Sequence, residues 1–212
     1  MNDRRINTSL EVIGSDTTAE MSGHKGGMLY HVEVLLGRRL FRVFCCLHIN
    51  ELPWRHIVEQ LDGPTSSKSG WQGSVGKLFT GVNSMERKEI FEPIHLLEPL
   101  VDIPDEVAKK MSTDSSVAWK ILKTIGQGKL EPEVSALMCG KLCHSRWLTA
   151  GMRCLMLYMS KHILSRHDEE MLKQLATWVT QICLPLLFLF MVKHHIKHEP
   201  GHHLTLFRLW RQ

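Results

Sequence analysis

The sequence predicts a mostly α-helical fold with a small parallel β-sheet near its N-terminal end. Only two segments, residues 10–14 and 40–45, have the β-branched or alternating composition of strands. The residues between them have helical spacing, and from residue 105 onward apolar residues recur with helical periodicity. With 212 residues and a hydrophobic fraction of 43%, the chain can fill the core of one domain, or of one domain with a helical appendage.

The N-terminal elements predict a strand–helix–strand unit. A strand over residues 10–14 precedes Asp16, a helix covers residues 28–36, and a second strand over residues 40–45 ends at Cys45. Strands joined by such a crossover pair in parallel with a right-handed connection. We therefore expect Asp16 and Cys45 at the same edge of the sheet, where ligands and catalytic groups gather in such folds.

The remainder of the chain predicts one loop and a series of helices. A helix follows from Leu47 to Leu61, with Pro53 expected near its first turn or at a kink. Residues 63–76 are rich in glycine and serine and predict an exposed, mobile loop. Further helices are expected over residues 105–111, 115–126 (capped from residues 112–114), 131–139, 145–164 and 167–192.

These elements divide the chain into four expected parts. Residues 1–62 hold the strand–helix–strand segment, and residues 63–104 form a loop-rich connection. Residues 105–192 form an all-helical region, in which the methionines of the helix over 145–164 are expected to fill the core. Residues 193–212 form a basic, histidine-rich tail, which we expect to be solvated.

Charge and cysteine content narrow the classes of function. The formal net charge of +4 permits contact with nucleic acid without requiring it. The chain starts with a polar segment that lacks the apolar run of a signal peptide, so we expect the six cysteines to stay reduced in the nucleus or cytoplasm. The longest apolar run, residues 182–192, is too short to cross a bilayer and predicts a buried helix, so no membrane association is expected.

Three short motifs occur in an order that points to a family. Asp16 follows the first strand, Cys45 and His48 form a Cys-x-x-His motif after the second, and Arg146 and Trp147 open a long helix much later in the chain. This order resembles the hAT superfamily of DNA transposases. The chain also resembles transposon-derived reading frames, in three blocks over residues 25–27, 47–56 and 62–65.

The resemblance implies an incomplete RNase H-like core, with residues 1–62 as part of the core and residues 105–192 as its helical insertion. In that family a set of carboxylates holds two divalent cations for phosphoryl transfer on DNA. Asp16 matches the second of these acids, whereas Asp3 and Glu199 lie in contexts unlike those of the first and third. Because one carboxylate is a poor magnesium site, the resemblance implies a catalytically inactive fragment. Asp16 is then a vestigial catalytic residue, and the chain has no cofactor of its own, while an intact relative uses Mg²⁺.

Three of the motif residues also have ordinary structural interpretations. Asp16 is equally well explained as a turn or cap residue. Arg146 and Trp147 are candidate DNA contacts, since arginine binds phosphate and tryptophan stacks on bases. The alternative is that the pair anchors a helix to its core, because a tryptophan buries a large apolar area.

Cys45 and His48 are interpreted as a structural motif, in which the cysteine packs at the strand end and the histidine orders the start of the next helix. The alternative is a zinc site. Most structural zinc sites have four ligands, so Cys45 and His48 would need two companions. Cys139, Cys143 and His144 are the available companions, at irregular spacing. We therefore predict no metal site.

The resemblance also implies a partner. A core that lacks its first strands leaves a sheet edge exposed, and exposed edges recruit other strands. We hypothesise an inactive transposase-derived protein that associates with DNA, with an intact transposase subunit or with another protein that covers this edge. The alternatives are an α-helical protein–protein interaction module and a nuclease subunit completed in trans by a second chain.

Overall fold

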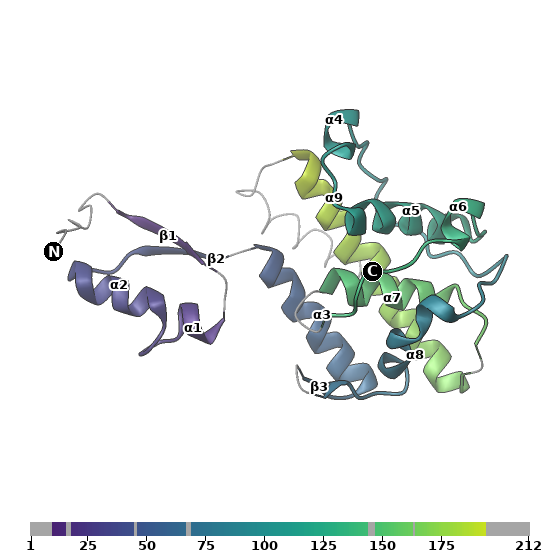
Figure 1. The fold of residues 1–212 in the computed structure, drawn as a ribbon, viewed down its shortest axis with the longest axis horizontal. Coiled ribbons are helices and arrows are strands. Elements are labelled where there is room, and N and C mark those ends of the chain that lie inside the picture. The colour runs from purple at the N-terminus through teal and green to yellow at the C-terminus, as the bar shows by residue number, and fades with distance from the viewer. Residues whose placement is uncertain are drawn as a thin grey trace. The chain divides into compact units, whose positions relative to one another are not determined.

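The computed structural model describes residues 10–15, 18–44, 46–66, 69–143, 147–162 and 164–193 (Figure 1). Over these ranges the protein is mostly helical, with two small two-stranded sheets. The prediction of a mostly helical chain with a small parallel sheet is confirmed. The chain divides into two compact units, Met1–Leu52 and Pro53–Gln212, which we term unit 1 and unit 2.

Unit 1 is built on a parallel pair of short strands. Its main elements are β1 (Val12–Ser15), α1 (Ala19–Ser22), α2 (Met28–Leu36) and β2 (Phe41–Phe44). The strands pair in parallel, with Val12 beside Phe41, and both helices lie on the same side of the pair (Figure 1). The predicted strand–helix–strand unit is thus confirmed, and α1 is a short helix that the sequence did not indicate. Gly37 ends α2 in a left-handed conformation, with a φ of 64°.

A long helix, α3 (Cys46–Asp62), contains the position at which the two units divide. The helix predicted from Leu47 to Leu61 is confirmed, but Pro53 lies well inside it and not in its first turn. A proline there has no N–H to donate to the carbonyl of residue 49, so the helix lacks one backbone hydrogen bond at the boundary between the units.

The prediction of an exposed loop over residues 63–76 is only partly confirmed, because Pro64, Ser69, Gln72 and Ser74 are exposed but Trp71, Val75 and Gly76 are buried. β3 (Thr65–Ser66) and β4 (Gly70–Trp71) form an antiparallel pair, and Trp71 is only 6% exposed. The physical reason is the buried carboxylate of Asp62, which accepts hydrogen bonds from the N–H groups of Val75 at 2.9 Å and Gly76 at 2.7 Å. The glycines of this segment permit a close approach of backbones, which composition alone does not distinguish from mobility.

The rest of unit 2 is helical with irregular connections. Ser112 caps the long helix after residue 112, as predicted, because its side chain accepts a hydrogen bond from the N–H of Ser115 at 3.2 Å. The helix expected over 131–139 is shorter than predicted. The remaining elements are η1 (Gly76–Thr80), η2 (Val82–Ser84), α4 (Asp105–Ala108), α5 (Thr113–Gln127), α6 (Pro132–Ser135), α7 (Trp147–Tyr158), α8 (Arg166–Trp178), η3 (Val179–Cys183) and α9 (Leu184–Lys193).

The helix predicted over residues 145–164 ends early, at Tyr158. The chain leaves the helix there because its backbone pairs with an extended strip far away in sequence. The N–H of Lys88 donates to the carbonyl of Met159, and the N–H of Lys161 donates to that of Glu86, both at 2.7 Å. This non-local pairing cannot be recognised from the helical periodicity of the sequence.

The helix predicted over residues 167–192 is confirmed as α8, η3 and α9 in continuous succession. The η3 segment is a π-helical turn, and it widens the helix directly before Pro185, which cannot donate a backbone hydrogen bond. Among the described residues, this is the one helix long and apolar enough to cross a membrane. In the protein 61% of its most apolar stretch is buried, as in the core helix of a water-soluble domain.

The hydrophobic core of unit 2 forms where α5, α7 and α8 pack against one another. The methionines of α7, expected to fill the core, do so: Met152 and Met156 are fully buried, as is Met159 directly after the helix. Large buried side chains from the flanking helices complete the cluster, among them Ile121, Leu122, Leu175 and Phe188. Unit 2 therefore has a core of its own.

Candidate interaction surface

The structure describes only part of the predicted site. Asp16, Cys45 and Arg146 lie outside the described residues. His48 lies in α3, and its side chain is outside the described set as well. The expected meeting of Asp16 and Cys45 at one edge of the sheet therefore stays a prediction, although the parallel pairing of β1 and β2 that it requires is present.

Trp147, the remaining predicted DNA contact, is the first residue of α7 and only 6% exposed. Its ring packs on the neighbouring turn, since a Cβ added to Gly151 would lie 3.5 Å from its Cε3 atom. A buried ring cannot stack on a base while it remains in the core. The burial favours the alternative interpretation, in which Trp147 anchors α7 to the rest of unit 2.

No group of three or more histidine, cysteine or acidic side chains lies close enough to hold a metal ion, within the part of the chain that the structure describes. Cys139, a companion in the zinc alternative, is 5% exposed, and burial raises the pKa of its thiol to about 11. Zinc binds the thiolate, so a thiol kept protonated at neutral pH is a poor ligand.

The feature of unit 1 that stands out is a bare apolar face on the β1–β2 pair. Side chains of a strand point alternately to opposite faces. Val12 and Phe41, which are directly opposite each other, and Val43 point away from the helices and are 52%, 73% and 43% exposed. We call these three side chains the bare face.

An ion pair fixes which side chains of β2 point away from the helices. Arg42 lies between Phe41 and Val43, and its Nη2 atom donates to Oε2 of Glu33 in α2 at 2.7 Å. Glu33 also accepts from the N–H of Leu40 at 3.1 Å. The hydrogen bond from Arg42, followed by that from Leu40, lowers the pKa of the Glu33 carboxyl. Because Arg42 is held against α2, its two neighbours must point to the opposite face.

Both edges of the pair are also open. The N–H of Phe41 donates to the carbonyl of Glu11 at 2.8 Å, so the backbone groups of Glu11 and of alternate residues beyond it face β2. The backbone groups of Val12 and Gly14 consequently face away from β2. Within the described residues, no third strand joins either side of the pair. Unit 1 therefore offers an apolar face beside strand edges that no other described strand covers.

The outer side of α2 is apolar as well. Met28, Val34 and Leu35 are 57%, 58% and 72% exposed, whereas Leu29 is buried. Of the ten large hydrophobic side chains that are exposed in the described residues, eight belong to unit 1. Exposed apolar residues scattered singly are ordinary, but such a concentration is typical of a surface that another protein covers.

The sequence analysis missed two buried arginines of unit 2. Arg153, in the apolar pattern of α7, donates to the carbonyls of Phe79 at 2.6 Å and Gly140 at 2.7 Å. Arg87 donates to the carbonyls of Val82 and Met85 and to the hydroxyl of Ser160, and burial lowers its pKa. These guanidinium groups hold irregular segments together, so their role is structural. The only sequence signal for a buried arginine is an arginine within an apolar helical pattern. This signal identifies Arg153 but not Arg87.

Comparison with known proteins found no matching family model, no matching curated protein and no matching solved structure.

Proposed function

We propose that this chain is a non-catalytic association protein, derived from the RNase H-like core of a hAT-like transposase. In this proposal unit 1 docks on an intact transposase subunit, which pairs a strand with an open edge of β1–β2 and packs apolar side chains on the bare face. The observation that carries the proposal is the exposure of Val12, Phe41 and Val43 on a parallel sheet. Parallel sheets occur almost only where both faces are covered.

The energetics of the bare face favour a covered state. Full burial of a valine or phenylalanine side chain stabilises a protein by about 1.5–3 kcal/mol. An isolated two-stranded unit is marginally stable at best, and an added strand brings both apolar burial and main-chain hydrogen bonds, as in known cases of strand addition. A partner that supplies a strand therefore satisfies both deficits of unit 1.

The absence of catalysis rests on the sequence. Transfer of a phosphoryl group through two metal ions needs several carboxylates that converge, and Asp16 alone matches the family's pattern. Association with DNA receives less support, since the ring of Trp147 is buried. We therefore place the surviving function in protein–protein association through unit 1.

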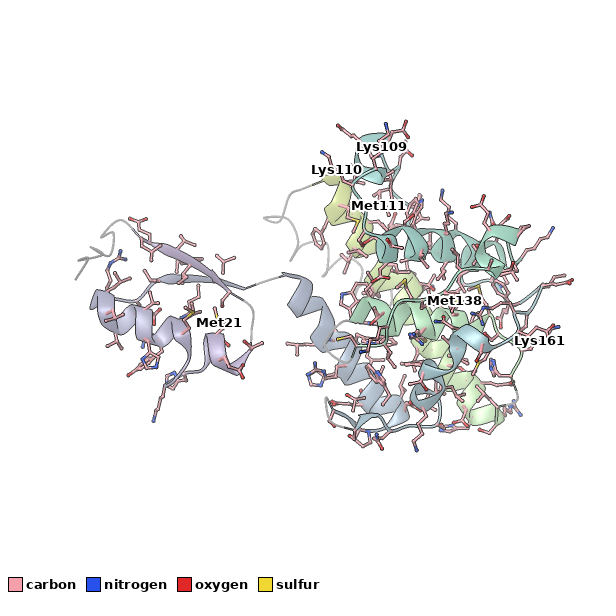
Figure 2. The ribbon with its side chains drawn as sticks, viewed as in Figure 1. Met21, Lys109, Lys110, Met111, Met138 and Lys161 are labelled. Atoms are coloured by element: carbon pink, nitrogen blue, oxygen red, sulfur yellow. The ribbon has the colours of Figure 1, made fainter. Side chains whose placement is uncertain are left out.

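The test is a binding measurement between the full chain and the purified RNase H-like core of an intact hAT-like transposase. Phe41→Glu places a charge in the bare face and should weaken binding about tenfold or more, as loss of a central apolar contact does. Met138→Glu is the matched control, because Met138 is 65% exposed but belongs to unit 2 (Figure 2). Its effect should be negligible.

Three results would overturn parts of the proposal. Equal effects of Phe41→Glu and Met138→Glu would show that the bare face is not the docking surface. Magnesium-dependent nicking of plasmid DNA by the full chain alone would contradict the non-catalytic assignment. The molecular mass of the chain in solution could also rise with concentration and return to that of the monomer in Phe41→Glu. The partner would then be a second copy of this chain and not a transposase subunit.

A further inference from the structure

Unit 2 contains a cleft of about 450 Å³ that plays no part in the proposed function. One wall is the first two turns of α8, and the other is the extended strip around residues 88–92 together with Tyr158 and His162. The volume lies within the range of small-molecule sites. All its lining residues belong to unit 2, so the cleft is independent of the bare face on unit 1.

The strip that forms one wall is held rigidly from both sides. Its residue Arg87 bridges Ser160, and Ile90 bridges Lys129, both in antiparallel fashion. The side chain of Ile90 is nevertheless 77% exposed, and it lines the cleft together with the ring of Tyr158. The cleft therefore presents apolar surface on a fixed backbone, a preorganised arrangement that lowers the cost of binding.

An ion pair joins the two walls of the cleft. The Nζ atom of Lys173 in α8 lies 2.8 Å from Oε1 of Glu92 in the strip. The hydroxyl of Tyr158 donates to the carbonyl of the same Glu92 at 2.9 Å. Burial, with a smaller contribution from Glu92, raises the pKa of Tyr158 to about 12, so its hydroxyl remains a neutral donor. The charges of Lys173 and Glu92 are thus paired within the protein.

The two walls of the cleft also carry opposite charges that do not form an ion pair with each other. Lys88 projects from the strip and Glu169 from α8, and both line the cleft. No ion pair joins them among the residues that the structure describes. His162 lines the cleft as well. Burial is the main cause that lowers its pKa, and Lys88 lowers it further, whereas a backbone hydrogen bond at Ser160 and the charge of Glu169 act in the opposite direction.

We propose that this cleft binds a small zwitterion of the α-amino acid type, with its carboxylate beside Lys88, its ammonium group beside Glu169 and an apolar side chain against Ile90. A ligand with a single charge satisfies one of the two groups and leaves the other beside it unpaired. A ligand with both charges satisfies Lys88 and Glu169 together. Arg166, also in the lining and exposed, adds positive charge toward the carboxylate.

The test uses the full chain, with leucine as the probe and NMR chemical shifts as the readout. Leucine should shift the signals of the cleft residues and saturate at millimolar concentrations. N-acetyl-leucine, which lacks the ammonium group, and leucinamide, which lacks the carboxylate, should each bind about tenfold more weakly, as loss of one charged hydrogen bond predicts.

Variants assign each end of the ligand to its residue. Lys88→Gln should weaken leucine about tenfold and leave leucinamide unchanged, whereas Glu169→Gln should weaken leucine and leave N-acetyl-leucine unchanged. Lys161→Gln is the control, because Lys161 is exposed, pairs with Glu86 and lies outside the lining (Figure 2). Thermal unfolding of each variant checks that the fold persists.

The proposal is overturned if leucine shifts no cleft signal even at tens of millimolar, or if N-acetyl-leucine binds as well as leucine. Equal losses in Lys161→Gln and Lys88→Gln would also overturn it, because the effect would then reflect net charge alone.

Discussion

The two units of this chain differ in which side chains they bury. In unit 2 charged side chains are drawn into the interior and used: Asp62 accepts two backbone N–H groups, and Arg153 donates to the carbonyls of three residues. In unit 1 the charged pair Glu33–Arg42 stays near the surface, and the large apolar groups are the exposed ones. Unit 2 therefore buries charged groups that are hydrogen-bonded, whereas unit 1 leaves large apolar side chains exposed.

This difference indicates which contacts stabilise each unit. A buried polar group that is fully hydrogen-bonded specifies one arrangement of the segments around it. Asp62 and Arg153 are such groups in unit 2, and they hold the irregular segments that they contact. Unit 1 has four-residue strands and an open face, so its order depends on what covers it.

Replacement of Arg153 by methionine should cost the most. Arg153→Met keeps much of the side-chain volume but leaves buried carbonyls of Phe79 and Gly140 without their donor. We expect a loss of about 4 kcal/mol in the free energy of unfolding. Denaturant unfolding followed by tryptophan fluorescence measures it, since all six tryptophans lie within residues 53–212. Lys120→Met removes an exposed ion pair with Glu133 and should cost less than about 0.5 kcal/mol. Similar losses in both variants would remove the contrast.

Two glycine-to-alanine changes should have opposite signs. A Cβ on Gly73 would lie 1.7 Å from the carbonyl oxygen of Asp62, so Gly73→Ala forces the backbone apart and should cost about 2–3 kcal/mol. Gly126 lies within α5 with nothing within 4 Å of the added atom, so Gly126→Ala should stabilise unit 2 by about 0.5–1 kcal/mol. If Gly73→Ala proves neutral in the same denaturant assay, residues 63–76 are mobile after all, as their composition suggested.

The fold was predictable wherever local pattern and global packing agree. The parallel pair, α2 and the long helix after residue 165 all follow from periodicity and helix-stop signals. Residues 63–76 and the early end of α7 did not, because both depend on contacts between distant residues. The carboxylate of Asp62 determines the first, and the pairing of Lys88 with Met159 determines the second. Composition carries no information about such contacts.

The candidate surface was predictable in kind but not in place. We expected an open sheet edge from the family that the motifs resemble. The bare face depends on which side of the strands α2 covers, and that side is set by the contact of Arg42 with Glu33. The cleft was not predictable at all, because it joins the strip around residues 88–92 to α8. Each of its charged residues looks like ordinary solvated surface in the sequence.

Amide hydrogen exchange should separate the units directly. We expect the amides of β1 and β2 to exchange many orders of magnitude faster than those of α7 in the free chain, because few buried contacts protect a two-strand pair. Saturation with the transposase core should slow exchange in β1 and β2 and leave α7 unchanged. If the amides of β1 and β2 are already as protected from exchange as those of α7 in the free chain, unit 1 is stable without a partner. That result would contradict the proposal of a covering strand.

The smallest expected effect concerns the pH dependence of unit 1. Arg42 and the N–H of Leu40 lower the pKa of Glu33 in the folded chain, so its carboxylate stabilises the fold above the pKa of the unfolded state. This contribution is lost as the pH falls through the lowered folded pKa, below the ordinary value of about 4.3. Exchange at β2 should therefore be steady from neutral pH to about 5, after correction for the intrinsic rate, and rise in more acid solution. Glu33→Gln should remove the acid-induced step. If the step persists in this variant, another carboxylate causes it. The Arg42–Glu33 pair would then not be the contact that fixes the orientation of the bare face relative to α2.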